Sequence, residues 1–223
     1  PDGERVEWVF ATDQPWSGFN YYLGDLQSRV AINVDLPVPS LSLGHLVAHE
    51  AYPGHHTEHC RKEVGLVRAR GQLEEAIFLV GTPQCLLAEG LADSALEALV
   101  GERPEAVVGP LLAAEGVPYR ADEVAAAREP LARLSRARAN LALQLHHEGR
   151  PVDDVVGWAQ RWLLLPRDRA EKVVAFCADP TWRAYVFCYT EGVGLCRRYV
   201  AGDPRRFEEL LTEQLVPADL DAA

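Results

Sequence analysis

Histidine and glutamate side chains gather in one short stretch, residues 43–60, which reads LGHLVAHEAYPGHHTEHC. Four histidines and one glutamate fall within the twelve residues from His45 to His56. Neutral imidazoles bind zinc, and a carboxylate next to them can take a proton from water that the metal activates. The adjacent pair His49 and Glu50 therefore predicts the centre of a zinc hydrolase.

The position of the second histidine requires an interrupted helix. In the common HExxH pattern the two histidines lie four residues apart on one helical face, but that position here is Pro53. In an unbroken helix His55 would be rotated by about 240° from His49, and His56 would lie about 10.5 Å further along the axis. Because Pro53 removes a backbone donor and Gly54 permits unusual dihedral angles, we expect a bulge that returns His55 towards His49. His56 is the alternative ligand.

Two further features complete the set of candidate ligands. His45 and His49 are also four residues apart and would suit zinc without any distortion, so this competing pair stays open. The stretch 85–98, CLLAEGLADSALEA, places Glu89 among apolar helical neighbours. A carboxylate in such surroundings is costly unless it is paired or binds a metal, so Glu89 is the predicted third ligand.

The two motifs together resemble a known bacterial family. HEAYPGHH (His49–His56) followed by AEGLA (Ala88–Ala92) is similar to domain-of-unknown-function family number 885, whose signature is HExxPGHH with a later EGWA. The fold of that family is similar to that of the helical zinc carboxypeptidases of the Taq type, within the gluzincin peptidases. The resemblance implies a Zn2+ cofactor bound by His49, a histidine of the PGHH step and Glu89. It also implies that Glu50 is the general base.

A tyrosine motif near the C-terminus extends the resemblance. Family members carry Tyr-x-x-Gly, and Tyr189–Gly192 reads YTEG at the corresponding place. In the implied mechanism Tyr189, or Tyr185 one helical turn earlier, donates a hydrogen bond to the developing oxyanion. The sequence departs from the family at Leu91, where EGWA has tryptophan. The resemblance covers about residues 18–200, the C-terminal half of family members.

Length and composition limit the classes of protein. The 223 residues, 48% of them hydrophobic, are enough for a globular chain with a buried core. The formal net charge of -11 argues against nucleic acid as a partner, because phosphate binding requires a basic surface. No apolar run approaches the roughly 20 residues of a membrane-spanning helix, so no membrane partner is expected. The expected partner is a peptide or small amide substrate, with the oligomeric state left open.

The cysteines and the absence of methionine bear on location. Five cysteines without a CxxC spacing favour buried free thiols over a disulfide framework or a thiolate zinc site. This usage predicts a cytoplasmic protein. The sequence contains no methionine, so we expect it to be the C-terminal part of a longer protein, which leaves secretion open.

Two stretches near the N-terminus are typical of β-strands. Residues 5–10 predict a short strand, and residues 18–36 predict a half-buried strand with period-two alternation. An edge position would let a substrate peptide pair with residues 29–35. Two prolines end that strand, and Ser40 or Ser42 is expected to cap the helix that carries the histidines.

Helical periodicity dominates the remainder of the chain. The expected fold is mainly α, a helical zinc-peptidase-like domain with a small β element near the N-terminus, and residues 1–223 form a single catalytic domain. Pro130 is expected to kink or split the longest helical segment. The helical segments are expected at residues 55–79, 83–100, 104–115, 120–147, 152–164, 167–177, 181–200 and 204–214.

Three functions remain open on the sequence. The favoured one is a metallopeptidase that cleaves peptide bonds with zinc-activated water. The alternatives are a zinc hydrolase of non-peptide amides or esters, and a non-catalytic metal-binding interaction domain. The presence of Glu50 favours an enzyme, because a closed structural zinc site has no need of a base.

Overall fold

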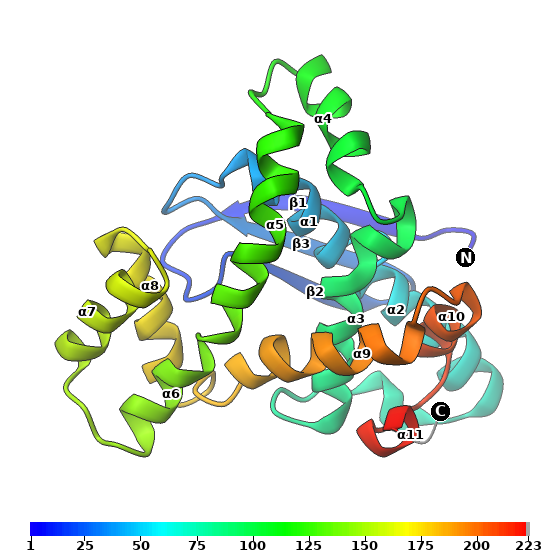
Figure 1. The fold of residues 1–223 in the computed structure, drawn as a ribbon. Helices are drawn as coiled ribbons and strands as arrows, with labels where there is room; N and C mark the ends of the chain where they lie inside the picture. Colours follow the sequence, from blue (N-terminus) through cyan, green and yellow to red (C-terminus); the bar gives the residue numbers. More distant parts are fainter. Residues whose placement is uncertain (222–223) are drawn as a thin grey trace.

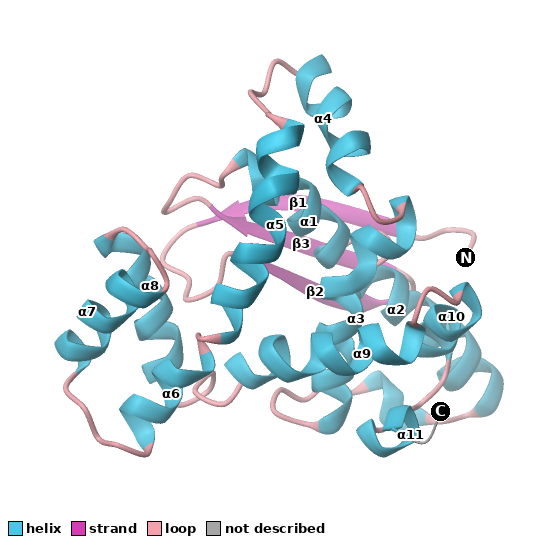
Figure 2. Cartoon of the chain, in the orientation of Figure 1, coloured by secondary structure: helices cyan, strands magenta, loops and turns pink. Residues whose placement is uncertain are grey.

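A small sheet at the N-terminus is followed by helices that make up most of the described chain, residues 1–221 (Figure 1). The computed structural model thus confirms the expected fold class, mainly α with a small β element. Figure 2 shows the three strands grouped together beside the helices that follow them. Among residues 1–221, no helix is both long enough and apolar enough to cross a membrane.

The sheet contains β1 (Arg5–Ala11), β2 (Gly18–Gly24) and β3 (Gln27–Asn33) in the order β1-β3-β2. β1 runs parallel to β3, and β2 runs antiparallel to it. The strand expected over 18–36 is therefore two strands, separated by a turn at Asp25 and Leu26, whose φ angles are 50° and 59°.

Of the two strands, β2 lies at an edge of the sheet, whereas β3, which contains residues 29–33 of the segment proposed to pair with a peptide, is central and pairs on both sides. The backbone groups of β3 are used within the sheet over residues 27–33, so a substrate peptide cannot pair with them.

The histidine stretch lies on α1 (Ser40–Glu50) and α2 (His55–Lys62), and both helices pack against the sheet. The expected serine cap of α1 is wrong. Pro39 occupies the N-cap position, and Ser42 Oγ donates to its carbonyl oxygen at 3.0 Å from within the first turn.

The helix expected over 55–79 is shorter than predicted. α2 continues as the π-helical segment η1 (Glu63–Arg68), and the chain then turns at Gly71 with a φ of 72°. A short 3-10 turn, η2 (Leu73–Ala76), follows before the next helix.

The later helices agree closely with the prediction, with two exceptions. Pro130 lies inside α5 without splitting it, and the break comes after Arg136. The helix expected from residue 181 begins at Val186, after a series of turns. The elements are α3 (Pro83–Val100), α4 (Pro104–Ala114), α5 (Ala121–Arg136), α6 (Ala139–His146), α7 (Val152–Trp162), α8 (Arg167–Ala178), η3 (Cys188–Gly192, π-helical), α9 (Val193–Val200), α10 (Pro204–Thr212) and α11 (Pro217–Asp221).

α3 is the helix around which the catalytic candidates are arranged. It packs against α1, η3, α9 and α10, and nine of its eighteen residues are buried. A separate apolar cluster joins α6, α7 and α8, which stand together to one side in Figure 1. The elements that carry the histidines, Glu89 and the tyrosines therefore meet around α3.

Candidate metal centre

The Pro-Gly step interrupts the helix as the sequence predicts. α1 ends at Glu50 and α2 begins at His55, so the chain changes direction over residues 51–54. The Tyr52–Pro53 peptide bond is cis. A Cβ atom at Gly54 would lie 2.0 Å from the carbonyl oxygen of His49, so only glycine fits there. The interruption returns His55 to His49, with 3.2 Å between their Nε2 atoms.

Glu89 from α3 completes a triangle with these two nitrogens. Its Oε2 lies 3.3 Å from His49 Nε2, and its Oε1 lies 3.2 Å from His55 Nε2. Ligand atoms about 2.0–2.1 Å from a tetrahedral zinc ion lie about 3.3–3.4 Å from one another. The three side chains are therefore spaced as three ligands of one metal ion would be, and they form a group that could hold one.

The hydrogen-bonding pattern around this triangle also fits a cation. His49 Nδ1 lies 2.9 Å from Asp93 Oδ1, so Asp93 favours a proton on Nδ1, and Nε2 is the nitrogen that could bind a metal ion. Within residues 1–221, the buried Glu89 Oε2 has no hydrogen-bond partner. A metal ion bound to Nε2 would replace the proton that the nearby carboxylates favour there, and it would also satisfy the carboxylate oxygen.

The charges of the site depend strongly on one another. Burial alone would raise the pKa of the Glu89 carboxyl, but the imidazoles of His55 and His49 outweigh it and lower the pKa well below the usual range. Burial alone would lower the pKa of His49, whereas Asp93 and Glu89 together raise it. Burial alone would also lower the pKa of His55, but the Glu89 carboxylate raises it above its ordinary value. The Glu89 carboxylate is thus ionised, as a metal ligand must be.

Asp93 is the site residue that the sequence reasoning missed. Its Oδ1 contacts both His49 Nδ1 at 2.9 Å and His45 Nε2 at 3.1 Å. It lies one turn after Glu89 on α3, and this i, i+4 spacing of two acids was the available signal. A carboxylate on the second nitrogen of a metal-binding histidine fixes the tautomer and the orientation of the ring.

His45 and His49, the competing pair of candidate ligands, are linked by Asp93, which contacts both rings. His45, His49 and Asp93 form a second group that could hold a metal ion, in which His49 would use Nδ1. His49 Nε2 faces His55 and Glu89 instead. His45 is the most exposed member, with 46% of its side chain accessible, so this second group lies at the outer rim of the first.

His56, the alternative ligand, lies away from the triangle. Its Nδ1 is 2.8 Å from Ser28 Oγ on β3, and its ring is fully buried. Cys60 Sγ lies 3.6 Å from its Nε2. The structure therefore brings His55 and not His56 to His49, and His56 joins α2 to the sheet.

Glu50 is buried beside the candidate ligands and points towards β2. A Cβ atom at Gly18 would lie 2.9 Å from Glu50 Oε1, so a glycine on the strand leaves room for this carboxylate. Asn20 Nδ2 donates to the Glu50 carbonyl oxygen at 2.7 Å and holds the end of α1 on the strand. Burial raises the pKa of the Glu50 carboxyl, against the effect of the nearby His49 and His55. A raised pKa suits a group that accepts and returns a proton.

The two tyrosines have different surroundings. The Tyr185 hydroxyl donates to Glu89 Oε1 at 2.5 Å, so Tyr185 positions a candidate ligand. The Tyr189 ring lies 6.4 Å from the His49 ring and 5.5 Å from the Tyr185 ring. Burial raises the pKa of Tyr189 well above its ordinary value, so its hydroxyl keeps a proton to donate.

Two glycines allow the tyrosine segment to approach α3. A Cβ atom at Gly90 would lie 2.3 Å from the Gly192 carbonyl oxygen, and one at Gly192 would lie 2.3 Å from the Leu86 carbonyl oxygen. The glycines of EGLA and YTEG are therefore partners in one backbone contact. This contact places Tyr185 and Tyr189 over Glu89 and His49.

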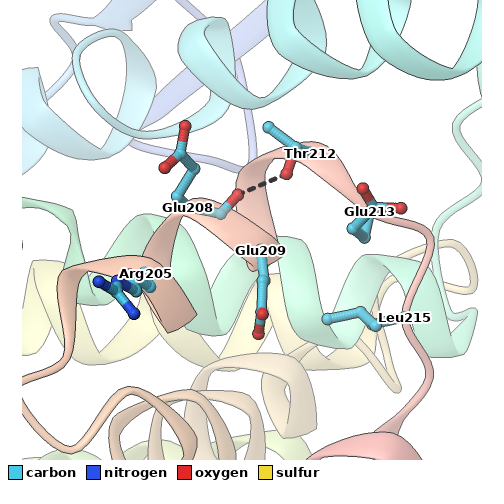
Figure 3. Close-up of a pocket in the computed structure, with 6 residues that line it drawn as sticks. All are labelled: Arg205, Glu208, Glu209, Thr212, Glu213 and Leu215. Carbon is cyan, nitrogen blue, oxygen red and sulfur yellow. Dashed lines mark hydrogen bonds between the residues drawn. The ribbon is translucent and has the colours of Figure 1, made fainter.

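A surface hollow of about 630 Å3 lies elsewhere, along α10 (Figure 3). Its acidic side chains already have partners: Glu208 pairs with Arg61, and Glu213 pairs with Arg70. Glu209 accepts from the Tyr199 hydroxyl. This hollow lacks the converging unsatisfied groups of the candidate metal centre, which is therefore the stronger candidate site.

No family model, curated protein or solved structure matches this chain. The resemblance of its motifs to family number 885 therefore stays a prediction.

Proposed function

We propose that the chain is a zinc-dependent hydrolase, and specifically a metallopeptidase. The observation that carries the proposal is the triangle of His49 Nε2, His55 Nε2 and Glu89, with sides of 3.2–3.3 Å. Two imidazoles and one carboxylate are the ligand set of many catalytic zinc sites, which keep a further position for water or substrate. Such a set with Glu50 next to a ligand supports catalysis over a closed structural site.

Zinc held by these side chains would polarise the scissile carbonyl group and make water a stronger nucleophile. Glu50 takes the proton of the attacking water and passes it to the leaving amine. Its buried position and raised pKa support both transfers. Asp93 keeps the His49 ring in the tautomer that presents Nε2.

Tyr189 is the proposed donor to the developing oxyanion. Tyr185 is already bonded to Glu89, whereas no group in residues 1–221 hydrogen bonds with the Tyr189 hydroxyl. A fixed donor aimed at the developing charge lowers the barrier most where water is excluded. The choice of a peptide as substrate follows from the motif resemblance, and comparing peptides with small amides and esters would test it.

The zinc content of purified variants tests the proposal. We expect about one zinc ion per wild-type chain and a loss of binding in His49→Ala, His55→Ala and Glu89→Ala, because each removes one of three protein ligands. His56→Gln, which keeps a polar group beside Ser28, should retain the metal. Full zinc occupancy in His55→Ala with loss in His56→Gln would reverse the ligand assignment. Full occupancy in all the variants would remove the zinc site.

A further inference from the structure

Two buried thiols face each other where α3 meets the tyrosine segment. Cys85 Sγ on α3 lies 3.8 Å from Cys188 Sγ, the first residue of η3. All five cysteines are free and buried. Neither thiol of this pair takes part in the proposed hydrolysis, and both belong to one apolar cluster with Tyr185.

The backbone around the pair is suited to a covalent link. A disulfide requires an S–S distance of about 2.05 Å, so the two sulfur atoms must approach by about 1.7–1.8 Å. Gly90 and Gly192 already hold α3 and η3 in backbone contact. Rotation of the two cysteine side chains about their χ1 angles is the movement that would bring the sulfur atoms together.

The two thiols are chemically unequal. Cys85 lies in the first turn of α3, where Thr82 is the N-cap and its side chain accepts from the Cys85 backbone N–H. The positive end of the helix dipole favours a thiolate there. The contact between the two thiols lowers the pKa of Cys85 and raises the pKa of Cys188. Cys85 is therefore the nucleophile and Cys188 the thiol that resolves its oxidised form.

The other three thiols lack this activation. Burial raises the pKa of Cys60 and of Cys177 to about 11, and that of Cys196 to about 12. Cys196 donates to the Leu87 carbonyl oxygen at 3.5 Å instead of meeting another thiol. A thiol held protonated reacts slowly with oxidants.

We propose that Cys85 and Cys188 are a redox modification site, which a small hydroperoxide converts into a disulfide between α3 and η3. The Cys85 thiolate attacks one peroxide oxygen and the O–O bond breaks; a sulfenic acid forms, and the departing hydroxide takes up the proton that the Cys85 thiol released and leaves as water. Cys188 then attacks the Cys85 sulfur and a second water leaves. In total, two thiols and one hydrogen peroxide give one disulfide and two waters.

This bond would connect redox state to the candidate metal centre. Cys188 immediately precedes Tyr189, and both cysteines pack against Tyr185, which holds Glu89. Rotation of the two cysteine side chains would move atoms in the cluster that contains Tyr185 and packs against Tyr189. The oxidised chain should therefore differ from the reduced chain in the environment of Trp182, which lies 5.3 Å from the Tyr185 ring.

The test is oxidation of the purified full chain with hydrogen peroxide, followed by alkylation in denaturant and peptide mass spectrometry. We expect a Cys85–Cys188 crosslink that dithiothreitol reverses, formed at least about tenfold faster than any oxidation of Cys60, Cys177 or Cys196. Equal oxidation of all the cysteines, or a native chain whose Cys85 and Cys188 stay reduced, would overturn the proposal.

Variants separate the roles of the two thiols. In Cys188→Ser, oxidation should stop at a Cys85 sulfenic acid, which dimedone traps. In Cys85→Ser, Cys188 should remain a thiol. Cys196→Ser is the matched control, because it removes an equally buried thiol that has no thiol neighbour among residues 1–221. The crosslink should form in this control at the wild-type rate. These readouts do not require zinc or a substrate, so they stand apart from the proposed hydrolase activity.

Discussion

The carbonyl oxygen of His49 occupies the space that a side chain at Gly54 would need, 2.0 Å from an added Cβ atom. The same backbone position is close to Ala48, whose carbonyl oxygen accepts from Gly54 N–H at 2.9 Å. The end of α1 and the start of α2 are thus in direct backbone contact. This contact brings His49 and His55, which are six residues apart in the sequence, together in one site.

Replacing Gly54 with alanine should therefore destroy the site. The added methyl group must push α2 away from α1, and we expect a loss of at least about 2 kcal/mol in the free energy of unfolding, together with loss of zinc binding. Urea unfolding and metal analysis would measure both. Gly157→Ala in α7 is the control, because Gly157 is exposed with no atom within 4 Å of an added Cβ. That change should not destabilise the chain. A Gly54→Ala chain as stable as wild type would contradict the packing described.

The contact between Asp93 and His49 should set the metal affinity. Asp93→Asn keeps the shape of the side chain but removes the charge that favours the Nδ1–H tautomer, so zinc affinity should fall by about 10–100-fold. Competition with a chromogenic chelator measures this change. Glu97→Gln, one turn later on α3, removes an acid that pairs with Arg128 and Arg197 and should leave the affinity unchanged. Equal affinities in both variants would exclude a role for Asp93.

The parts of this structure that the sequence predicted depend on local chemistry. Pro53 and Gly54 cannot continue a regular helix, so the interruption before His55 could be expected from the two residues themselves. The helix that carries Glu89 was predicted with the observed limits, residues 83–100, because Pro83 starts it and Gly101 follows its end. Local signals of this kind need no knowledge of neighbouring elements.

The parts that were wrong or missed depend on contacts between distant segments. β3 is central because β1 pairs with it in parallel, and alternation within a strand does not reveal which neighbours it has. Asp93 was missed because its role depends on α1 lying against α3. The link between Gly90 and Gly192 likewise became visible only when the two segments were seen in contact. Spacing along the chain suggested Glu89 but not the residues that orient its partners.

His59 should make stability depend on pH. Its ring stacks on Tyr22 at 4.8 Å and meets the edge of Phe78 at 5.6 Å, and burial lowers its pKa to about 4. The unfolded chain binds a proton on this histidine below about pH 6.5, whereas the folded chain does so only near pH 4. Stability from this group is therefore full above pH 6.5 and falls as the pH drops towards 4.

His59→Phe keeps an aromatic ring between Tyr22 and Phe78 and removes the titration. Between pH 7 and pH 5 we expect the free energy of unfolding to fall by about 1–2 kcal/mol more in wild type than in the variant. This range allows for screening by solvent, because the ring is partly exposed. Urea unfolding at both pH values, with a chelator present so that metal release does not contribute, measures the difference. Identical pH dependence in the two chains would show that His59 is not held neutral by the fold.

Glu50→Gln should separate metal binding from catalysis. The amide has nearly the shape of the carboxylate but cannot take a proton from water, and general base catalysis contributes about 10²–10⁴-fold to rate. We therefore expect kcat/KM to fall by about 10²–10⁴-fold on the best substrate from a mixed peptide library, with unchanged zinc content. The exposed Glu148→Gln should leave both quantities at their wild-type values. If Glu50→Gln lost zinc as Glu89→Ala does, Glu50 would be a ligand. If it kept the full rate, another group would have to be the base.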